Sequence, residues 1–246
     1  MNASSDPRGE AAARTRFAHV DAWVFDLDNT LYPRHANLFQ QVDQRIREYV
    51  AKLLGVPHDE AQRIQKDYYQ RYGTTLRGLM DEHGIQPDDF LEYVHDIDHS
   101  VVRPDPRLAD AIDRLPGRKF IFTNGSRRHA EKVAERLGIP GHFEEIFDIV
   151  SSELLPKPNR ETYDRFVRMS GIEPGRAAMF EDLSRNLEVP KALGMATVLV
   201  VPKGTREVLT EDWELEGRDA PYVEFVTDDL ASFLETVVVT GPGHRA

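Results

Sequence analysis

The feature that most constrains the fold of this 246-residue chain is a change of pattern along its length. From Arg103 onward, short apolar runs typical of buried strands alternate with helical patterns, several of which end in glycine. One strand pattern, Ala22–Asp26, lies apart from these, and residues 34–103 after it show only helical periodicity. Strands that alternate with helices indicate right-handed crossovers, so we expect an α/β fold with a doubly wound parallel sheet.

The same alternation predicts the domain boundaries. After the first strand, we expect strands at Lys119–Phe122, Phe147–Val150, Ala177–Phe180, Thr197–Val201 and Tyr222–Val226. We interpret residues 34–103 as a helical cap inserted into a core made of residues 18–33 and 104–236. Residues 1–17 and 237–246 are interpreted as flexible tails, because small and charged side chains without periodicity bury little apolar surface.

Composition and charge exclude several classes of protein. The absence of cysteine excludes a disulfide framework, a thiolate metal site, an iron–sulfur cluster and a cysteine nucleophile. A formal net charge of −11 argues against a nucleic-acid polymer or an anionic membrane as partner. No apolar run approaches the roughly 18 residues of a spanning helix, and the first residues lack a signal-peptide pattern. We therefore expect a globular protein of the cytoplasm.

Polar side chains follow four of the expected strands, at the point where each strand ends. Doubly wound sheets bind their ligands outside the carboxyl ends of the strands, so these side chains form the candidate site. They are Asp26, Asp28 and Thr30 after the first strand, Thr123, Asn124 and Gly125 after the second, Lys157 after the third, and Glu181, Asp182 and Asn186 after the fourth.

These residue types fit the transfer of a phosphoryl group. Asp26 and Asp182 would form a hard-oxygen site for Mg²⁺, and the metal would keep Asp26 ionised as a nucleophile that forms an aspartyl-phosphate. Asp28 suits a general acid for the leaving oxygen and then a general base for water. Lys157 would neutralise charge on the phosphoryl oxygens, and Thr123 with neighbouring N–H groups would hydrogen-bond them.

The remaining residues of the set are expected to support these roles. Phosphate binding is assigned to Thr30, Thr123, Asn124, Gly125 and Lys157. Glu181 and Asn186 are expected beside the metal, where Asn186 would orient a metal-bound water and Glu181 would contact the metal directly or through water. Taken singly, Asp26 and Asp28 could also be turn and cap residues, and Lys157 a solvated loop lysine.

Four motifs, in order and suitably spaced, resemble those of the haloacid dehalogenase-like hydrolases. The motifs are DLDNT at 26–30, TNGS at 123–126, the PKP-centred Lys157, and EDLSRN at 181–186. The resemblance implies a Rossmann-like core, an inserted helical cap and dependence on Mg²⁺. The resemblance also implies that Asp26 is the nucleophile and a metal ligand, that Asp28 also binds the metal through its carbonyl oxygen, and that Asp182 is the third protein ligand.

Within that superfamily, the chain resembles the bacterial pyrimidine 5′-nucleotidases. The supporting segments are FDLDNTLYP at 25–33, YGTTLRGL at 72–79, VHDID at 94–98, TNGSRRHA at 123–130 and FEDLSRNL at 180–187. The resemblance implies hydrolysis of a small phosphate monoester, a nucleoside 5′-monophosphate such as UMP or CMP. Asp28 favours a phosphatase, because the dehalogenase branch lacks this second aspartate.

Two other functions stay open at this stage. One is a sugar-phosphate or phosphoglycolate-type phosphatase on the same core, because the motifs contact only the phosphoryl group. The other is a non-catalytic protein that binds phosphate ligands. In the cap, Tyr72, Arg77 and His95 are candidate substrate contacts, although packing or surface roles explain the same pattern. The oligomeric state is left open.

Overall fold

The computed structural model describes residues 7–202, 217 and 219–238, and these form one six-stranded sheet. The strands are β1 Ala22–Phe25, β2 Arg118–Phe122, β3 Glu145–Phe147, β4 Ala177–Glu181, β5 Ala196–Val200 and β6 Phe225–Thr227. Their order is β3-β2-β1-β4-β5-β6, and every neighbouring pair is parallel. The predicted parallel, doubly wound α/β sheet is confirmed. The strand order reverses between β1 and β4, the point at which such sheets bind ligands.

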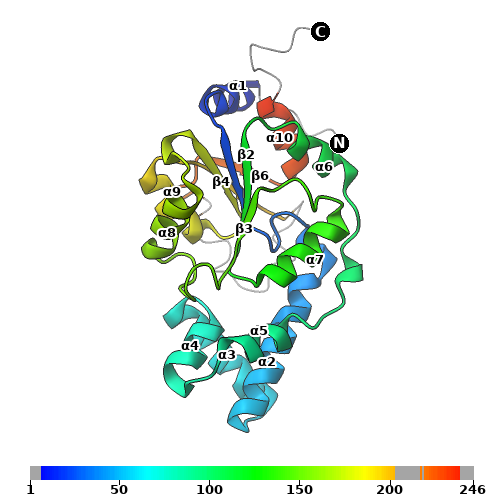
Figure 1. Cartoon of the computed structure of the whole chain (residues 1–246), viewed down its shortest axis with the longest axis vertical. Coiled ribbons are helices and arrows are strands. Elements are labelled where there is room, and N and C mark those ends of the chain that lie inside the picture. The colour runs from blue at the N-terminus through cyan, green and yellow to red at the C-terminus, as the bar shows by residue number, and fades with distance from the viewer. Residues whose placement is uncertain (1–6, 203–216, 218, 239–246) are drawn as a thin grey trace.

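Helices cover both faces of this sheet (Figure 1). They are α1 Pro7–Phe17, α6 Pro106–Asp113, α7 Arg127–Leu137, α8 Arg160–Ser170, α9 Glu188–Leu193 and α10 Leu230–Val238, with short 3₁₀ turns η1 Arg34–Ala36, η2 His99–Val101, η3 Pro174–Arg176 and η4 Ser184–Leu187. Because both faces are covered, β1, β4 and β5 are buried at every residue and are apolar except for Glu181 at the end of β4 and Thr197 in β5.

The central strand β1 divides its side chains between two hydrophobic clusters. Trp23 and Phe25 belong to the cluster that holds buried residues of α1, α6, α7 and α10. Ala22 and Val24 belong to the cluster with α8 and η4. Successive side chains of a strand point to opposite faces, so four residues anchor β1 in both layers. This burial fixes the position of the chain directly after Phe25, where the site begins.

The prediction of a flexible tail over residues 1–17 is wrong for residues 7–17, which form α1. Ala13 and Phe17 are each only 3% exposed, and the Phe17 ring stacks on Trp23 with 5.9 Å between ring centroids. Two apolar side chains one helical turn apart are enough to dock a helix on an apolar sheet face, but they are too few to give a periodic pattern. Residues 1–6 lie outside the described part of the chain.

Three further boundaries also differ from the prediction. α10 continues to Val238 with Val237 buried, so the expected tail at 237–246 is wrong for its first two residues, and 239–246 lie outside the described residues. β3 ends at Phe147 because the Asp148 carboxylate accepts hydrogen bonds from the N–H groups of Arg127 and Ser151, which turns the chain. β6 begins at Phe225, after turns rather than at Tyr222.

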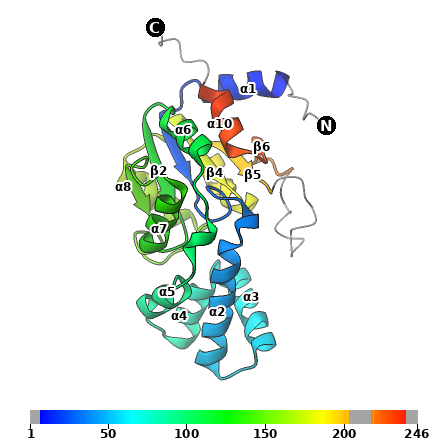
Figure 2. The same ribbon diagram turned by 90° about the vertical axis from the view of Figure 1, so that its right-hand side faces the viewer.

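Residues 34–103 contain four α-helices and no strand. The helices are α2 Leu38–Leu54, α3 His58–Tyr72, α4 Thr75–His83 and α5 Pro87–Val94. They pack around a hydrophobic cluster that also includes Ile149 from the loop after β3, with Val50, Ala61 and Leu79 fully buried. Figures 1 and 2 show this group at the end of the molecule opposite α1 and α10, and we call it the cap. Within the described residues, every helix is too short or too polar to span a membrane.

Candidate active site

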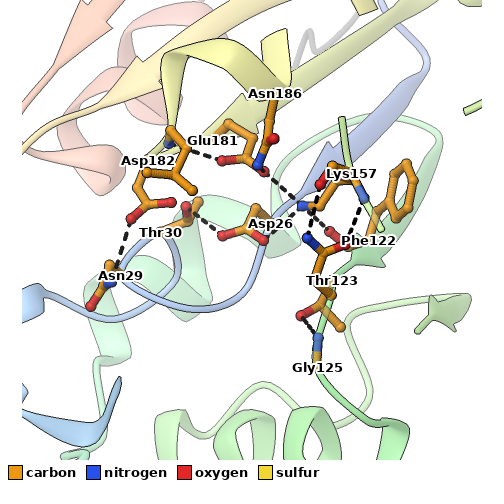
Figure 3. Close-up of polar contacts among 12 residues, drawn as sticks. Asp26, Asn29, Thr30, Phe122, Thr123, Gly125, Lys157, Glu181, Asp182 and Asn186 are labelled. Carbon is orange, nitrogen blue, oxygen red and sulfur yellow. Dashed lines mark hydrogen bonds and ion pairs between the residues drawn. The ribbon is translucent and has the colours of Figure 1, made fainter. Parts of the chain in front are cut away.

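Three adjacent strands deliver the candidate residues to one edge of the sheet (Figure 3). Asp26 follows β1 directly, Thr123 follows β2, and Glu181 is the last residue of β4 with Asp182 next to it. The order β2-β1-β4 therefore places Asp26 between the other two strand ends. The loop after β3 brings Lys157 into the same group.

Lys157 is buried and bonded to three acceptors. Its Nζ lies 2.8 Å from Asp26 Oδ1, 2.7 Å from Glu181 Oε1 and 2.8 Å from the carbonyl oxygen of Phe122. An ammonium group has three hydrogens, so the contacts use all of them. Burial alone lowers the pKa of Lys157, but Asp26 and Glu181 raise it above its usual value. The lysine is therefore held in its charged form.

Asn124 fixes the backbone of the lysine loop. Its Nδ2 donates to the carbonyl oxygen of Lys157 at 3.2 Å, and its Oδ1 accepts from the Lys157 N–H at 2.8 Å. The structure thus places this side chain against Lys157, whereas the sequence predicted a contact with phosphate. Positioning of the lysine is the role that the observed contacts support.

Asp26 is held at both carboxylate oxygens. Oδ1 accepts from Lys157, and Oδ2 accepts from the hydroxyl of Thr30 at 3.0 Å. The pKa of Asp26 is raised to about 7. Burial is the largest cause, Lys157 lowers the pKa, and the charge of Glu181 raises it further. Thr30 therefore orients the nucleophile candidate in this structure, in addition to the phosphate contact predicted from the sequence.

The acidic residues at this edge form a group that could hold a metal. Asp26, Glu181 and Asp182 each offer one oxygen, and the three oxygens lie within 4.8 Å of one another. Burial, together with Glu181 and Asp26, raises the pKa of Asp182 well above its usual value. Three carboxylates outnumber the ammonium of Lys157, and although Arg34 also acts on Asp182, the group keeps an excess of negative charge that a divalent cation would reduce.

The donor atoms fit a hard divalent cation. All three acids offer oxygen, and buried side-chain oxygens of Asn29 and Asn186 form no hydrogen bond within the described residues. Glu181 is the most occupied of the acids, because Oε1 accepts from Lys157 and from Asn186 and Oε2 accepts from the N–H of Leu183. Asp182 is less occupied, since Asn29 Nδ2 lies 3.4 Å from its Oδ2.

Asp28 lies outside this group and has its own partners. Its Oδ1 accepts from the hydroxyl of Tyr32 at 2.5 Å and from Nε2 of His129 at 2.9 Å. Burial raises the pKa of Asp28, but His129 and Tyr32 together lower it below its usual value. The two aspartates of the first motif are therefore held in different environments.

Thr123 and Gly125 form a tight turn facing Asp28. The hydroxyl oxygen of Thr123 accepts from the N–H of Gly125 at 2.9 Å. A Cβ atom at Gly125 would lie 3.3 Å from the Thr123 hydroxyl and 3.7 Å from Asp28 Oδ2. The glycine thus keeps the space beside the carboxylate open.

A model of the haloacid dehalogenase-like hydrolases matches residues 20–194. The chain belongs to this family. The match spans β1 to the end of α9 and includes all four motifs that carry the predicted site. The family resemblance predicted from the sequence is confirmed.

Two curated relatives of this haloacid dehalogenase-like hydrolase are similar along most of the chain. Phosphate metabolism protein 8 of Saccharomyces cerevisiae is 29% identical over 215 residues, which cover 80% of this chain and 64% of the yeast protein. The chain thus spans less than two thirds of that relative's length. Phosphoglycolate phosphatase of Chromobacterium violaceum is 28% identical over 199 residues, covering 74% of this chain and 85% of the relative.

Solved structures share the fold. L-2-haloacid dehalogenase from Xanthobacter autotrophicus, with chloropropionic acid covalently bound, covers 90% of this chain and 100% of its own, with 16% identity and a TM-score of 0.55. CbbY from Rhodobacter sphaeroides, in complex with phosphate, covers 88% and 99%, with 17% identity and a TM-score of 0.58. At these identities the likeness shows the fold of the hydrolase alone.

Of the three cap candidates in this hydrolase, only His95 reaches the core. Tyr72 donates to Glu82, and Arg77 forms an ion pair with Asp81 within α4, so both side chains are bonded to neighbours in the cap. The ring of His95 stacks on that of His129, with 4.5 Å between centroids.

The cap of the hydrolase also contacts two loops that carry candidate site residues. The guanidinium of Arg185, in the fourth motif, lies over the Tyr69 ring at 4.5 Å from its centroid. Gly73, at the end of α3 with a φ of 83°, lies so close to Pro156 that a Cβ atom would be 3.0 Å from the proline ring. A residue with a side chain would be strained there in both conformation and space.

Tyr32 and His129 are the site residues that the motif analysis missed. Both lie in segments that carried the resemblance, four residues after Asp28 and three residues after Ser126, which caps α7. The signal was their spacing: each is one helical turn from a motif residue, so each can fold back on the strand ends.

Proposed function

We propose that the protein is a Mg²⁺-dependent phosphatase that hydrolyses nucleoside 5′-monophosphates of the UMP or CMP kind through an aspartyl-phosphate. The observation that carries the proposal is the separate bonding of the two aspartates. Asp26 lies in the acidic group with Lys157, and Asp28 is bonded to Tyr32 and His129. A nucleophile and an acid–base group need different environments of this kind.

The metal site of this proposal consists of Asp26, Asp182 and the carbonyl oxygen of Asp28. A bound Mg²⁺ would keep Asp26 ionised and reduce its repulsion of the anionic ester. Glu181 is bonded to Lys157 at 2.7 Å and to Asn186 at 2.8 Å, so it is assigned to holding these two side chains beside the metal.

In the first step, a carboxylate oxygen of Asp26 attacks phosphorus and the ester P–O bond breaks. Asp28 gives its proton to the leaving oxygen. Its lowered pKa favours the carboxylate in the free protein, so the proton is taken up when the anionic ester approaches, because a nearby anion raises the pKa of a carboxyl group. Lys157 stabilises the negative charge on the phosphoryl oxygens.

In the second step, the Asp28 carboxylate takes a proton from water as that water attacks phosphorus. The bond between phosphorus and the Asp26 oxygen breaks, which releases phosphate and restores both carboxyl groups. The cap contacts at Arg185 and Gly73 lie beside the catalytic loops, where a closed cap would exclude bulk water from the aspartyl-phosphate.

Two observations support the phosphatase part of the proposal. Asp28 is present, and the curated relatives carry the names phosphate metabolism protein and phosphoglycolate phosphatase. The nucleotide part rests on the sequence resemblance to pyrimidine 5′-nucleotidases. A preference for phosphoglycolate is the competing substrate hypothesis, and the relative from Chromobacterium violaceum is the observation that favours it.

A substrate panel tests both parts. Phosphate release is measured with Mg²⁺ on UMP, CMP, AMP, phosphoglycolate and sugar phosphates, ranked by kcat/KM. We expect the pyrimidine nucleotides to rank first and Asp26→Asn to abolish turnover. Asp164→Asn, which removes an exposed carboxylate of α8, is the matched control and should retain activity. A preference for phosphoglycolate would contradict the proposed substrate class. Nucleotide binding without hydrolysis would contradict the proposal that the protein is an enzyme.

A further inference from the structure

Three histidines from three segments meet next to Asp28. His95 caps the C-terminus of α5, His99 begins η2 where the chain returns from the cap, and His129 lies in the first turn of α7. The rings of His95 and His99 lie 4.5 and 5.2 Å from the ring of His129, measured between centroids. His129 has no exposed surface, so it forms the centre of the cluster.

Hydrogen bonds connect this cluster in a chain that runs from the backbone of Ile97 through His99 and His129 to Asp28. The Nδ1 of His99 lies 3.1 Å from the carbonyl oxygen of Ile97, which can only accept, so His99 carries hydrogen on Nδ1. Burial, followed by His129, lowers the pKa of His99 to about 4. The Nε2 of His129 donates to Asp28, whose carboxylate oxygen can only accept, and the Nδ1 of His129 lies 3.1 Å from the Nε2 of His99, so these two nitrogens share one hydrogen.

The two oxygens of Asp28 are treated unequally by these contacts. Oδ1 accepts two hydrogen bonds, from Tyr32 and His129. Oδ2 lies on the side of Gly125, 3.7 Å from where a Cβ atom of that residue would be. An oxygen with two donors is a poor site for a proton, so Oδ2 is the oxygen that remains for proton transfer.

We propose that His129 is a positioning residue for Asp28, held in turn by His99 on the segment that rejoins cap and core. His129 and Tyr32 fix Oδ1, so that Oδ2 points toward the phosphoryl site and exchanges the proton with the leaving oxygen. The placement of the acid thereby depends on the chain that leaves the cap. This inference rests on the proposed phosphatase activity.

The test compares two leaving groups. A nucleoside 5′-monophosphate loses an alkoxide that needs a proton, whereas p-nitrophenyl phosphate loses a phenolate that leaves without one. The value of kcat/KM reports the step that forms the aspartyl-phosphate and excludes the later hydrolysis. A defect in placing the acid therefore lowers kcat/KM for the nucleotide and spares the aryl ester.

For His129→Leu we expect a loss of about 10- to 100-fold on the nucleotide and less than about threefold on p-nitrophenyl phosphate. His129→Gln should recover most of the loss, because its amide can donate to Asp28 from the position of Nε2. Tyr32→Phe should give a smaller loss with the same selectivity. His83→Leu is the matched control, since His83 also contacts a tyrosine hydroxyl, that of Tyr68, but within the cap.

Each outcome has a distinct meaning. Equal losses on both esters in a His129→Leu protein with a native thermal unfolding curve would overturn the positioning role, and so would a failure of His129→Gln to recover activity. If His129→Leu does not fold, the selectivity of Tyr32→Phe and His129→Gln decides. His99→Leu should show a selective loss of about threefold or more, and no loss would overturn the link to the cap segment. A wild-type protein that hydrolyses neither ester refutes the phosphatase itself.

Discussion

Lys157 in the core and Arg71 in the cap each contact two carboxylate groups, but their surroundings differ. The Lys157 side chain is 1% exposed and bonded to Asp26 and Glu181, whereas the Arg71 side chain is 51% exposed and paired with Asp67 and Glu82. Water and salt screen the exposed pairs and compete for the same groups. The buried group cannot lose one partner without leaving an uncompensated charge.

This difference indicates a division of labour between the two regions. The core edge holds its charged groups in one arrangement, as the proposed phosphoryl-transfer site requires before substrate arrives. The cap presents polar side chains such as Tyr72, which donates to Glu82, and Arg77, which pairs with Asp81. Such side chains can exchange these partners for a ligand. We infer that the core edge determines which reaction is catalysed and that the cap selects substrates by their leaving group.

The strongest test of this comparison removes each cation. Lys157→Met should lower kcat/KM by about 10³-fold and the free energy of unfolding by about 3–5 kcal/mol, because buried carboxylates lose their counter-charge. Arg71→Met should change kcat/KM by less than about threefold. Steady-state kinetics and urea unfolding check both variants, and comparable losses for the two would contradict the proposed division.

A phenylalanine in each region gives the next largest contrast. Phe17→Ala should lower the free energy of unfolding by about 3–5 kcal/mol, since the ring is buried between α1 and the sheet. Phe39→Ala, at a position 38% exposed in α2, should cost less than about 1 kcal/mol. Urea unfolding measures both. A small effect at Phe17 would show that α1 does not dock, and kcat/KM should stay unchanged in each variant.

The two regions should also respond oppositely to pH. The pKa of Asp26 is raised to about 7 in the fold, so between about pH 4 and 7 the unfolded chain has lost a proton that the folded protein keeps. Asp26 therefore makes the metal-free protein less stable as pH rises through this window, by at most about 1.4 kcal/mol per pH unit. The pKa of Glu82 in the cap is lowered by Tyr72 and Arg71, so its contribution is lost as pH falls.

Thermal unfolding with and without Mg²⁺ checks this prediction. Because the cation displaces the proton of Asp26, added Mg²⁺ should raise the Tm more at about pH 8 than at about pH 5. Asp26→Asn should lose most of that response, and Glu82→Gln should keep it. A Mg²⁺ response that is independent of pH would mean that Asp26 does not ionise on binding.

The sheet and its edge could be predicted from the sequence because strand ends fix positions. Asp26 and Asp182 directly follow strands, so their proximity depends only on topology, whereas Lys157 reaches them through the loop after β3; the family match supports the motifs. Their catalytic roles stay predictions. His129 could not be found in this way, because its contact with Asp28 depends on how α7 packs. The partners of Tyr72 and Arg77 likewise depend on the packing and surface of the cap.

The position of β1 in the centre of the sheet has a consequence for how the chain folds. β1 ends at Phe25, yet its two neighbours are residues 118–121 and 177–180. During synthesis from the N-terminus, the strand that precedes Asp26, the proposed nucleophile, therefore stays unpaired until most of the chain has emerged. The cap helices make mainly local contacts and can form earlier. The sheet edge that carries the proposed active site is thus completed late, after the helices of the cap.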